Sequence, residues 1–372
     1  MAYFSVTCFA HLLTTSLLVA SVGLACESTA LDARPDITTD QSENGASTTT
    51  LFDAIRISSD ATAEHFQVAT TTIDFGTAPL ALARLRVELE SPCFPFDKWT
   101  RSSIPEGHLW PESCDAFDRT LQLSIDDPEG DDVGEPPGLE LGRAITPFGG
   151  PLSLEFDLTD LANGLPGQHT LKLEIPTYPD PDGQVSGAKG EWGVTVELEL
   201  EPGTPPRRVL AVLPLAYTAR AAAAAEPIEF EAPAGAGSAR IEYRVTGHGG
   251  GARGARCLGP AEEFCRRDHR LYLDGELIDE FEPWRSDCSA LCTLVHYQSA
   301  LLELDYCAEN PCGATNSVRA SRANWCPGSV TPPRLIEHAS LTVPGAHRFN
   351  WTINEIADGG SWLLSAIYYA YE

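Results

Sequence analysis

Apolar and polar residues alternate one by one in several stretches of this chain. Leu85, Val87 and Leu89 alternate with charged residues, and the same period of two recurs over residues 171–175 and 194–200. In an extended strand successive side chains point to opposite faces, so each stretch predicts an antiparallel strand with one buried and one exposed face. The stretch 271–278 carries Asp-Gly at its centre and predicts a tight hairpin, because this pair favours positive φ angles.

Helical periodicity is weak by comparison. Residues 219–225 form a short alanine-rich segment that fits either a helix or a loop, and the chain contains 31 Gly and 28 Pro. A Pro/Gly-rich segment, 201–206, separates two halves with several short strands each. The pattern predicts an all-β chain of sandwiches or jelly rolls, with an N-terminal domain over 51–203 and a C-terminal domain over 204–372.

The charge of the chain limits its partners. It has 372 residues, with 25 basic and 53 acidic side chains and a formal net charge of −28. Such an acidic surface repels phosphate backbones and anionic headgroups, so we expect no nucleic-acid partner and no binding to an anionic lipid surface. The excess of carboxylates is typical of a well-solvated exported protein, which we expect to be a monomer.

The N-terminus predicts export. No charged residue occurs among the first 25, and the apolar run 12–25 is too short to span a bilayer comfortably. We expect residues 1–25 to be a signal peptide and residues 26–50 a disordered tether. Two alternatives remain for its end: cleavage after Ala25 gives a secreted protein, and lipidation of Cys26 gives a membrane-anchored lipoprotein at the cell surface.

The cysteines also indicate that the protein is exported. Nine of them follow the tether, and an exported, strand-rich chain favours disulfides over zinc, although Cys288-x3-Cys292 and Cys307-x4-Cys312 approach zinc-ligand spacings. Nine is an odd number. One thiol is therefore free or pairs outside this set, for example with Cys26.

Seven short motifs lie in order along the chain. They are Cys114-Asp-Ala-Phe-Asp-Arg119, Gly142-Arg-Ala-Ile-Thr-Pro147, Leu154-Glu-Phe-Asp-Leu-Thr-Asp160, Gly203-Thr-Pro205 with Leu210-Ala-Val-Leu-Pro-Leu215, Gly247-His248, Glu263-Phe-Cys265 with His269, and Arg322-Ala-Asn-Trp-Cys-Pro-Gly328. Together they resemble the peptide:N-glycosidase F family, bacterial amidases that release N-glycans from asparagine. Collinear matches to this family run from about Phe52 to near the end of the chain.

The resemblance implies two eight-stranded antiparallel jelly-roll sandwiches packed side by side, with the site in the cleft between them. It implies no metal and no other cofactor. It also implies three disulfides, and a fourth local bridge would then join the remaining close pair, leaving Cys292 unassigned. These four pairs are Cys93–Cys114, Cys257–Cys265, Cys288–Cys326 and Cys307–Cys312.

By the same resemblance Asp118 is the principal catalytic carboxylate and Glu263 the second one, with Glu262 as an alternative one residue away. Asp115 is expected to shape the turn after Cys114. The other implied contacts to substrate are the polar or charged groups of Arg119, Glu174, His248 and Arg322 and the aromatic faces of Phe117, Phe264, Trp325 and Trp284.

Two departures from the family pattern bear on activity. The third carboxylate of the family falls on Pro176, so Glu174, on the same strand face, would have to replace it through a local bulge. The loop between Cys93 and Cys114 is a long aromatic-containing insertion beside the expected catalytic carboxylate.

The leading hypothesis is therefore an exported glycoamidase, a hydrolase that cleaves the amide between asparagine and the innermost N-acetylglucosamine of N-glycoproteins or glycopeptides and leaves aspartate. The alternative is a catalytically inactive glycan- or protein-binding surface lipoprotein of the same fold. Paired jelly rolls also occur in copper monooxygenases, but the nine scattered histidines and the absence of methionine after Met1 disfavour copper.

Overall fold

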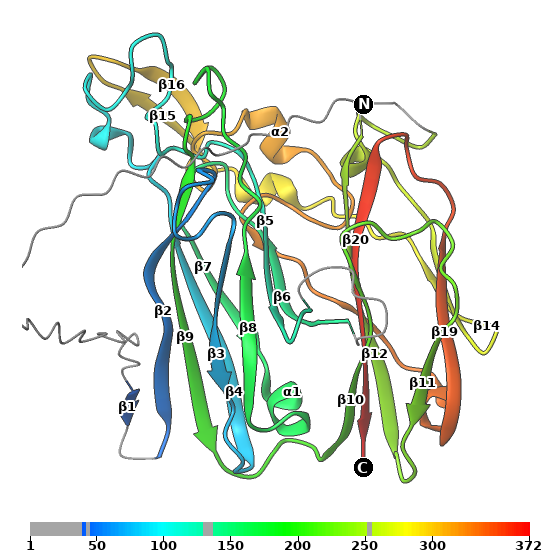
Figure 1. The fold of residues 1–372 in the computed structure, drawn as a ribbon. Helices are drawn as coiled ribbons and strands as arrows, with labels where there is room; N and C mark the ends of the chain where they lie inside the picture. The colour runs from blue at the N-terminus through cyan, green and yellow to red at the C-terminus, as the bar shows by residue number, and fades with distance from the viewer. Residues whose placement is uncertain (1–38, 42–44, 129–136, 251–254) are drawn as a thin grey trace, which may run out of the picture. The chain divides into compact units, whose positions relative to one another are not determined.

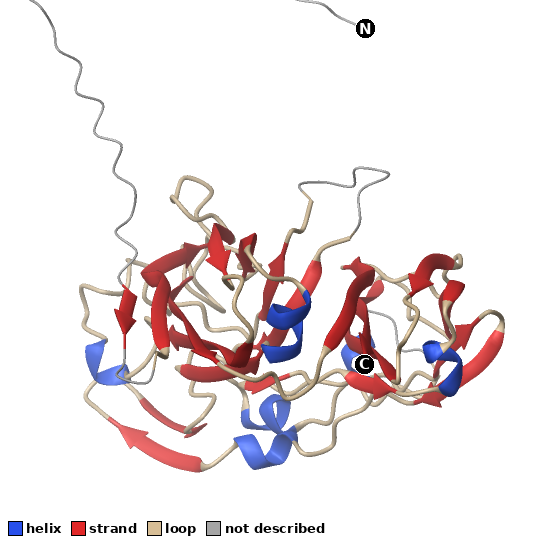
Figure 2. Cartoon of the chain, turned by 90° about the horizontal axis from the view of Figure 1, so that it is seen from below, coloured by secondary structure: helices blue, strands red, loops and turns tan. Residues whose placement is uncertain are grey.

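The protein is described from a computed structural model that covers residues 39–41, 45–128, 137–250 and 255–372. The expected signal peptide, Cys26 and most of the expected tether lie outside the described residues. The described residues pack as one unit. Strands dominate and the helices are short (Figure 2).

The N-terminal half contains two antiparallel five-stranded sheets, with orders β1-β2-β9-β4-β7 and β17-β6-β5-β8-β3. Nine of these strands come from the first 202 residues. They are β1 (Thr39–Gln41), β2 (Ser47–Ser58), β3 (Val68–Asp74), β4 (Leu80–Glu90), β5 (Thr120–Ile125), β6 (Leu139–Ile145), β7 (Leu152–Asp157), β8 (Gln168–Glu174) and β9 (Glu191–Pro202).

The C-terminal half contains two four-stranded sheets, with orders β10-β20-β12-β18 and β11-β19-β13-β14, and a separate hairpin, β15-β16. Figure 1 shows these strands in yellow-green to red. They are β10 (Val209–Thr218), β11 (Ile228–Ala232), β12 (Ser238–Gly249), β13 (His269–Leu273), β14 (Glu276–Phe281), β15 (Leu294–Gln298), β16 (Glu303–Cys307), β18 (Arg334–Ile336), β19 (Gly345–Ile353) and β20 (Gly360–Tyr371). The remaining strand, β17 (Ser329–Val330), belongs to a sheet of the N-terminal half.

Six helical turns connect these strands. Two are α-helical and four are 3-10 turns. They are α1 (Thr159–Gly164), α2 (Thr315–Arg319), η1 (Phe96–Lys98), η2 (Glu262–Phe264), η3 (Cys288–Leu291) and η4 (Ala339–Thr342). Over the described ranges, no helix has the length and apolar character needed to cross a bilayer.

The strand periodicity read from the sequence is confirmed. Leu85 and Val87 of β4 and Leu171 and Leu173 of β8 are fully buried in one core, which also includes Val196 of β9. Their charged neighbours lie on the opposite, solvated faces. Burial of alternate apolar side chains, at about 25 cal/mol per Å² of apolar surface, drives the pairing of these sheets.

Two local predictions have different outcomes. The hairpin is confirmed: β13 and β14 are joined at Asp274 and Gly275, which have φ angles of 53° and 84°. The alanine-rich segment 219–225 is a loop. Its amides bond to strands instead of to a preceding turn, because Ala221 N donates to Trp362 O and Ala225 N to Trp351 O.

The two halves are joined by more than their linker. β17, from the C-terminal part of the sequence, pairs with β6 of the N-terminal sandwich. Gln122 of β5 donates to the Tyr217 hydroxyl of β10 at 2.9 Å. The arrangement of antiparallel sheets is a jelly-roll fold, as expected, although β17 crosses the expected domain boundary.

Two expectations about the chain ends and the cysteines need correction. The expected tether, 26–50, overlaps β1 and the start of β2, because β2 pairs with β9 from residue 47 onward.

Three disulfides are as the resemblance implies, Cys93–Cys114, Cys257–Cys265 and Cys288–Cys326. The fourth prediction, Cys307–Cys312, is wrong. Cys292 and Cys307 bridge the base of the β15–β16 hairpin, so Cys312 is left as a free thiol.

Candidate active site

Asp118 lies on the short segment that follows the Cys93–Cys114 disulfide and leads into β5. The backbone of Arg119 holds this segment to the end of β6, since Arg119 N donates to Thr146 Oγ1 at 2.8 Å and Thr146 N to Arg119 O at 2.7 Å. A disulfide on one side and a paired strand on the other therefore fix the half-buried Asp118.

Asp115 does more than shape the turn. It is fully buried and accepts from Arg119 Nε at 2.8 Å, from Arg119 Nη2 at 2.9 Å and from Trp192 Nε1 at 3.1 Å. The guanidinium of Arg119 also lies over Phe117 at 4.9 Å and Tyr178 at 5.5 Å from the ring centroids. Asp115 thus sets the orientation of Arg119, and its bidentate pairing is the strong form of such a contact.

The C-terminal half contributes Glu263 and Arg322. Arg322 Nη1 donates to Glu263 Oε1 at 2.6 Å, and Nη2 donates to the carbonyl and hydroxyl of Ser317 at 2.8 and 2.9 Å. The guanidinium lies between two rings, 4.9 Å from the centroid of Phe264 and 4.4 Å from that of Trp325. Arg322 is therefore rigidly held, and its side chain is only 1% exposed.

The two carboxylates belong to one electrostatic site. Burial raises the pKa of Asp118 to about 7; the charge of Arg322 lowers it, that of Glu263 raises it, and that of Arg119 lowers it. Burial likewise raises the pKa of Glu263, against the effect of its partner Arg322. A carboxyl that changes charge near neutral pH suits proton transfer, and perturbed groups of this kind concentrate at functional sites.

His248 borders the same group of residues. Its ring stacks on Trp325 at 5.3 Å, and its Nε2 lies 2.7 Å from Thr246 Oγ1. That hydroxyl also accepts from Arg143 Nη1 at 3.0 Å. Burial, with the charges of Arg143 and Arg322, lowers the pKa of His248 to about 3. The ring is therefore neutral near pH 7.

Three residues expected to contact substrate, or to be alternatives for doing so, make other contacts in the structure. Trp325 is 2% exposed and donates to Gly247 O, so it supports Arg322 and offers no face to a sugar. Trp284 lies under Arg266. Glu262 is fully buried and pairs with Arg267 through both oxygens, which makes it structural and leaves Glu263 as the residue near Asp118.

Glu174 is engaged elsewhere. Its carboxylate lies 3.4 Å from Lys172 Nζ, and β8 pairs with β5 and β3 without a register shift, so no bulge moves it toward Pro176. Sequence reasoning missed Tyr178, which follows Pro176 by two residues, is 63% exposed and packs on Arg119. The period of two that placed Glu174 on this face also identifies Tyr178.

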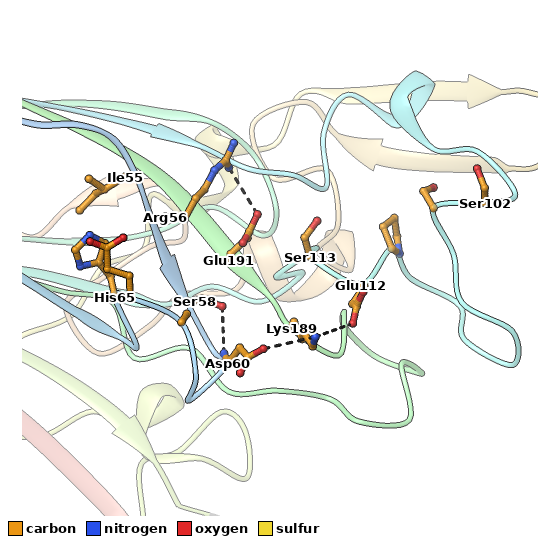
Figure 3. A pocket seen from close by; sticks show the side chains of 14 residues that line it. Ile55, Arg56, Ser58, Asp60, His65, Ser102, Glu112, Ser113, Lys189 and Glu191 are labelled. Carbon is orange, nitrogen blue, oxygen red and sulfur yellow. Dashed lines mark hydrogen bonds and ion pairs between the residues drawn. The ribbon is translucent and has the colours of Figure 1, made fainter. Parts of the chain in front are cut away.

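A pocket separate from these residues is lined in part by Glu112 and Ser113, as Figure 3 shows. It encloses about 690 Å³ and is lined by paired charges. Lys189 Nζ lies 3.6 Å from Asp60 and 3.3 Å from Glu112, and Arg56 lies 4.0 Å from Glu191. These charges compensate one another, and neither Asp118 nor Glu263 lines this pocket. We therefore do not assign the active site to it.

The zinc alternative for the cysteines is wrong. Cys288, Cys292 and Cys307 are in disulfides. Among the described residues the sulfurs of Cys93, Cys114 and Cys312 lie within 4.8 Å of one another, but two of them share a disulfide and offer no thiolate.

Comparison with known proteins gives one family and one fold. The family model described as peptide-N-glycosidase F, C terminal, matches residues 216–369. No curated protein sequence matches the chain.

Among solved structures, PNGF-II is 20% identical with a TM-score of 0.62, over 87% of this chain and 65% of its own. The chain thus spans about 65% of the length of PNGF-II. A peptide-N(4)-(N-acetyl-β-D-glucosaminyl)asparagine amidase is 19% identical with a TM-score of 0.63, over 88% and 96%. The PNGase F of Flavobacterium meningosepticum, titled a glycosylasparaginase, is 18% identical with a TM-score of 0.61, over 88% and 96%.

These structural matches show the fold of the chain. The family model adds a sequence match over residues 216–369. The resemblance seen in the sequence motifs is confirmed. Residues 216–369 thus belong to the peptide-N-glycosidase F family, and the chain as a whole has the fold of these proteins.

Proposed function

We propose that the protein is an exported glycoamidase that hydrolyses the amide between asparagine and the innermost N-acetylglucosamine of N-glycans. The observation that carries this proposal is the raised pKa of Asp118, in a motif of the family, beside Glu263 and Arg322 from the other half of the chain. The disulfides agree with an oxidising compartment.

In the proposed reaction Asp118, as its carboxylate, takes a proton from water while the water oxygen bonds to the amide carbonyl carbon. The same proton then passes to the glycosyl nitrogen as the carbon–nitrogen bond breaks. Aspartate remains on the peptide and a glycosylamine leaves. The guanidinium of Arg119, held by Asp115, is the donor we assign to the developing charge on the carbonyl oxygen.

The sugar side of the substrate is assigned to the C-terminal half. Glu263 accepts from the first sugars directly or through water. His248 binds a sugar hydroxyl through Nδ1, since its Nε2 is occupied by Thr246. Phe117 and Tyr178 supply the apolar faces on the N-terminal side, where both rings already border Arg119.

The direct test is release of glycan from a denatured high-mannose glycoprotein, followed by mass spectrometry for conversion of Asn to Asp. The wild type and Asp53→Asn, an exposed control on β2, should release glycan, and Asp118→Asn should not. Equal release by wild type and Asp118→Asn removes the proposed role of Asp118.

A second candidate function is an inactive glycan-binding surface lipoprotein. It is favoured by Pro176 at the position of the family's third carboxylate and by the pairing of Glu174 with Lys172. Under this alternative a glycan array shows binding that Asp118→Asn retains, while no Asn is converted to Asp in any substrate.

A further inference from the structure

An apolar cavity of about 840 Å³ lies between two excursions of the chain. One is the insertion between Cys93 and Cys114, and the other is the hairpin of β15 and β16. Figure 1 shows the insertion in cyan and the hairpin in gold beside each other. A disulfide closes the base of each, and Tyr297 of the hairpin donates to Asp97 of the insertion at 2.7 Å. The insertion and the hairpin are therefore each closed by a disulfide and held to one another by a hydrogen bond.

The cavity has an aromatic floor and a leucine-rich rim. Phe96 contacts Trp99, Tyr297 and Tyr306 edge-on or tilted, with ring centroids 5.2 to 5.5 Å apart. At the rim, Leu301 is 51% exposed. Exposed leucine beside packed aromatic rings predicts contact with another apolar group.

Three of the polar ring atoms already have hydrogen-bond partners. Trp99 Nε1 donates to Cys93 O at 2.8 Å, Trp110 Nε1 to Gln184 O at 3.3 Å, and the Tyr297 hydroxyl to Asp97. A sugar ring would lose its hydration here and find few partners for its hydroxyls, which is costly. An aliphatic or aromatic side chain has no such requirement.

The charge of the lining also favours one class of ligand. The described residues around the cavity include two carboxylates, Asp97 and Asp305, and no basic side chain. Asp305 is largely exposed and contacts His296. A lysine or arginine next to the bound apolar residue would be attracted to this rim, and a sialylated glycan would be repelled.

The cavity and the candidate site are linked through the Cys93–Cys114 disulfide. Its lining includes Cys312, which packs against the Cys93–Cys114 disulfide directly before the segment of Asp118. It also includes Gln184, on the loop that follows Tyr178.

We propose that this cavity binds the peptide part of the glycopeptide substrate, through a large apolar side chain near the glycosylated asparagine with a basic residue beside it. The proposal rests on the glycoamidase function above.

The test uses synthetic glycopeptides that carry one high-mannose glycan on the same asparagine. They differ only in a Phe or a Ser, flanked by Lys or by Glu. Burying a Phe ring predicts kcat/KM about tenfold higher or more for the Phe peptide with Lys. Leu301→Glu should reduce this ratio toward one, and Asp305→Asn should reduce the preference for Lys over Glu. Leu277→Glu, at a similarly exposed leucine on the β13–β14 hairpin, is the control and should keep both preferences.

The same peptides without glycan measure binding independently of hydrolysis, through the fluorescence of Trp99 and Trp110. Peptide binding that Leu301→Glu weakens, without glycan release from any substrate, keeps the cavity assignment and overturns the glycoamidase function. Glycan release with equal kcat/KM for all four peptides overturns the cavity assignment. Quenching by the free oligosaccharide and not by the peptides, lost in Leu301→Glu, assigns the cavity to glycan and also overturns it.

Discussion

Two carboxylate–arginine clusters contain residues from both halves of this protein, and the pKa values of Glu140 in one and of Asp118 in the other are shifted in opposite directions. In one, Glu140 of β6 accepts from Arg143 at 2.7 and 2.8 Å, from Arg244 of β12 at 3.3 Å and from the Ser365 hydroxyl. Its pKa is lowered in spite of complete burial. In the other, the pKa of Asp118 is raised to about 7.

The difference lies in how each carboxyl is paired. Glu140 is directly bonded to two guanidinium groups, which outweigh its loss of hydration. The guanidinium groups near Asp118 are bonded to other carboxylates, since Arg119 pairs with Asp115 and Arg322 with Glu263. Asp118 therefore pays for burial without a direct cationic partner. The first arrangement holds sheets together, and the second keeps a proton exchangeable near neutral pH.

The largest expected effect is on activity at the second cluster. Asp118→Asn removes the proposed base while keeping the shape of the side chain, and the loss in kcat is expected to be about 10² to 10⁴-fold. Glycan release measured with a dansylated glycopeptide gives this number, and a circular dichroism spectrum like that of the wild type shows that the fold is retained. A loss below tenfold would place the chemistry on another group.

Next in size is the effect on stability at the first cluster. Glu140→Gln leaves two buried guanidinium groups without their carboxylate and is expected to lower the free energy of unfolding by about 3–5 kcal/mol. Urea unfolding at pH 7 measures it, and Glu155→Gln, in an exposed pair with Arg86, should change little. Because the folded pKa of Glu140 is depressed, its contribution is present above the ordinary value of 4.5 and is lost as pH falls through the folded pKa. A constant difference down to strongly acidic pH would contradict this.

A smaller effect is expected at Asp118, where the dependence of stability on pH has the opposite sign to that at Glu140. Its folded pKa is raised, so the folded state holds a proton between the ordinary value of 3.8 and about 7 that the unfolded chain has lost. Its stability contribution is therefore present at low pH and is lost as pH rises through 7. Thermal melts should show that Asp118→Asn becomes more stable relative to the wild type from pH 5 to pH 8. No change in the difference between the two pH values would mean that Asp118 is charged throughout.

The smallest expected effect is a shift of the pH profile. The acid limb of kcat/KM should have an apparent pKa near 7, because the carboxylate form of Asp118 is the active one. Glu263→Gln removes a negative charge that raises this pKa and also leaves Arg322 uncompensated. Both changes move the limb to lower pH, whereas Glu191→Gln, in the other pocket, should leave it in place. A limb that stays in place in Glu263→Gln would mean that the charge of Glu263 does not affect Asp118, and a limb that moves to higher pH would contradict the proposed coupling.

The sequence alone determined the strands and the hairpin turn, which depend on short-range rules: a period of two and the positive φ of Asp274 and Gly275. The family resemblance came from motifs of a few adjacent residues, and three of the disulfides were implied by that resemblance. Asp118 also came from such a motif. The sequence did not distinguish Glu262 from Glu263, because two adjacent acids have the same chemistry until one of them is placed against Arg267.

The tertiary structure decided which partner each of these residues has. In the folded chain Cys307 forms a disulfide with Cys292 across a hairpin. Trp325 is buried against the guanidinium of Arg322, and Tyr178 packs against that of Arg119. The tertiary structure also formed the apolar cavity from two segments that are distant in the chain, since the hydrogen bond between Asp97 and Tyr297 joins residues 200 positions apart. Burial and charge compensation depend on contacts between residues distant in sequence, so the pKa of Asp118 follows from the fold and not from its motif.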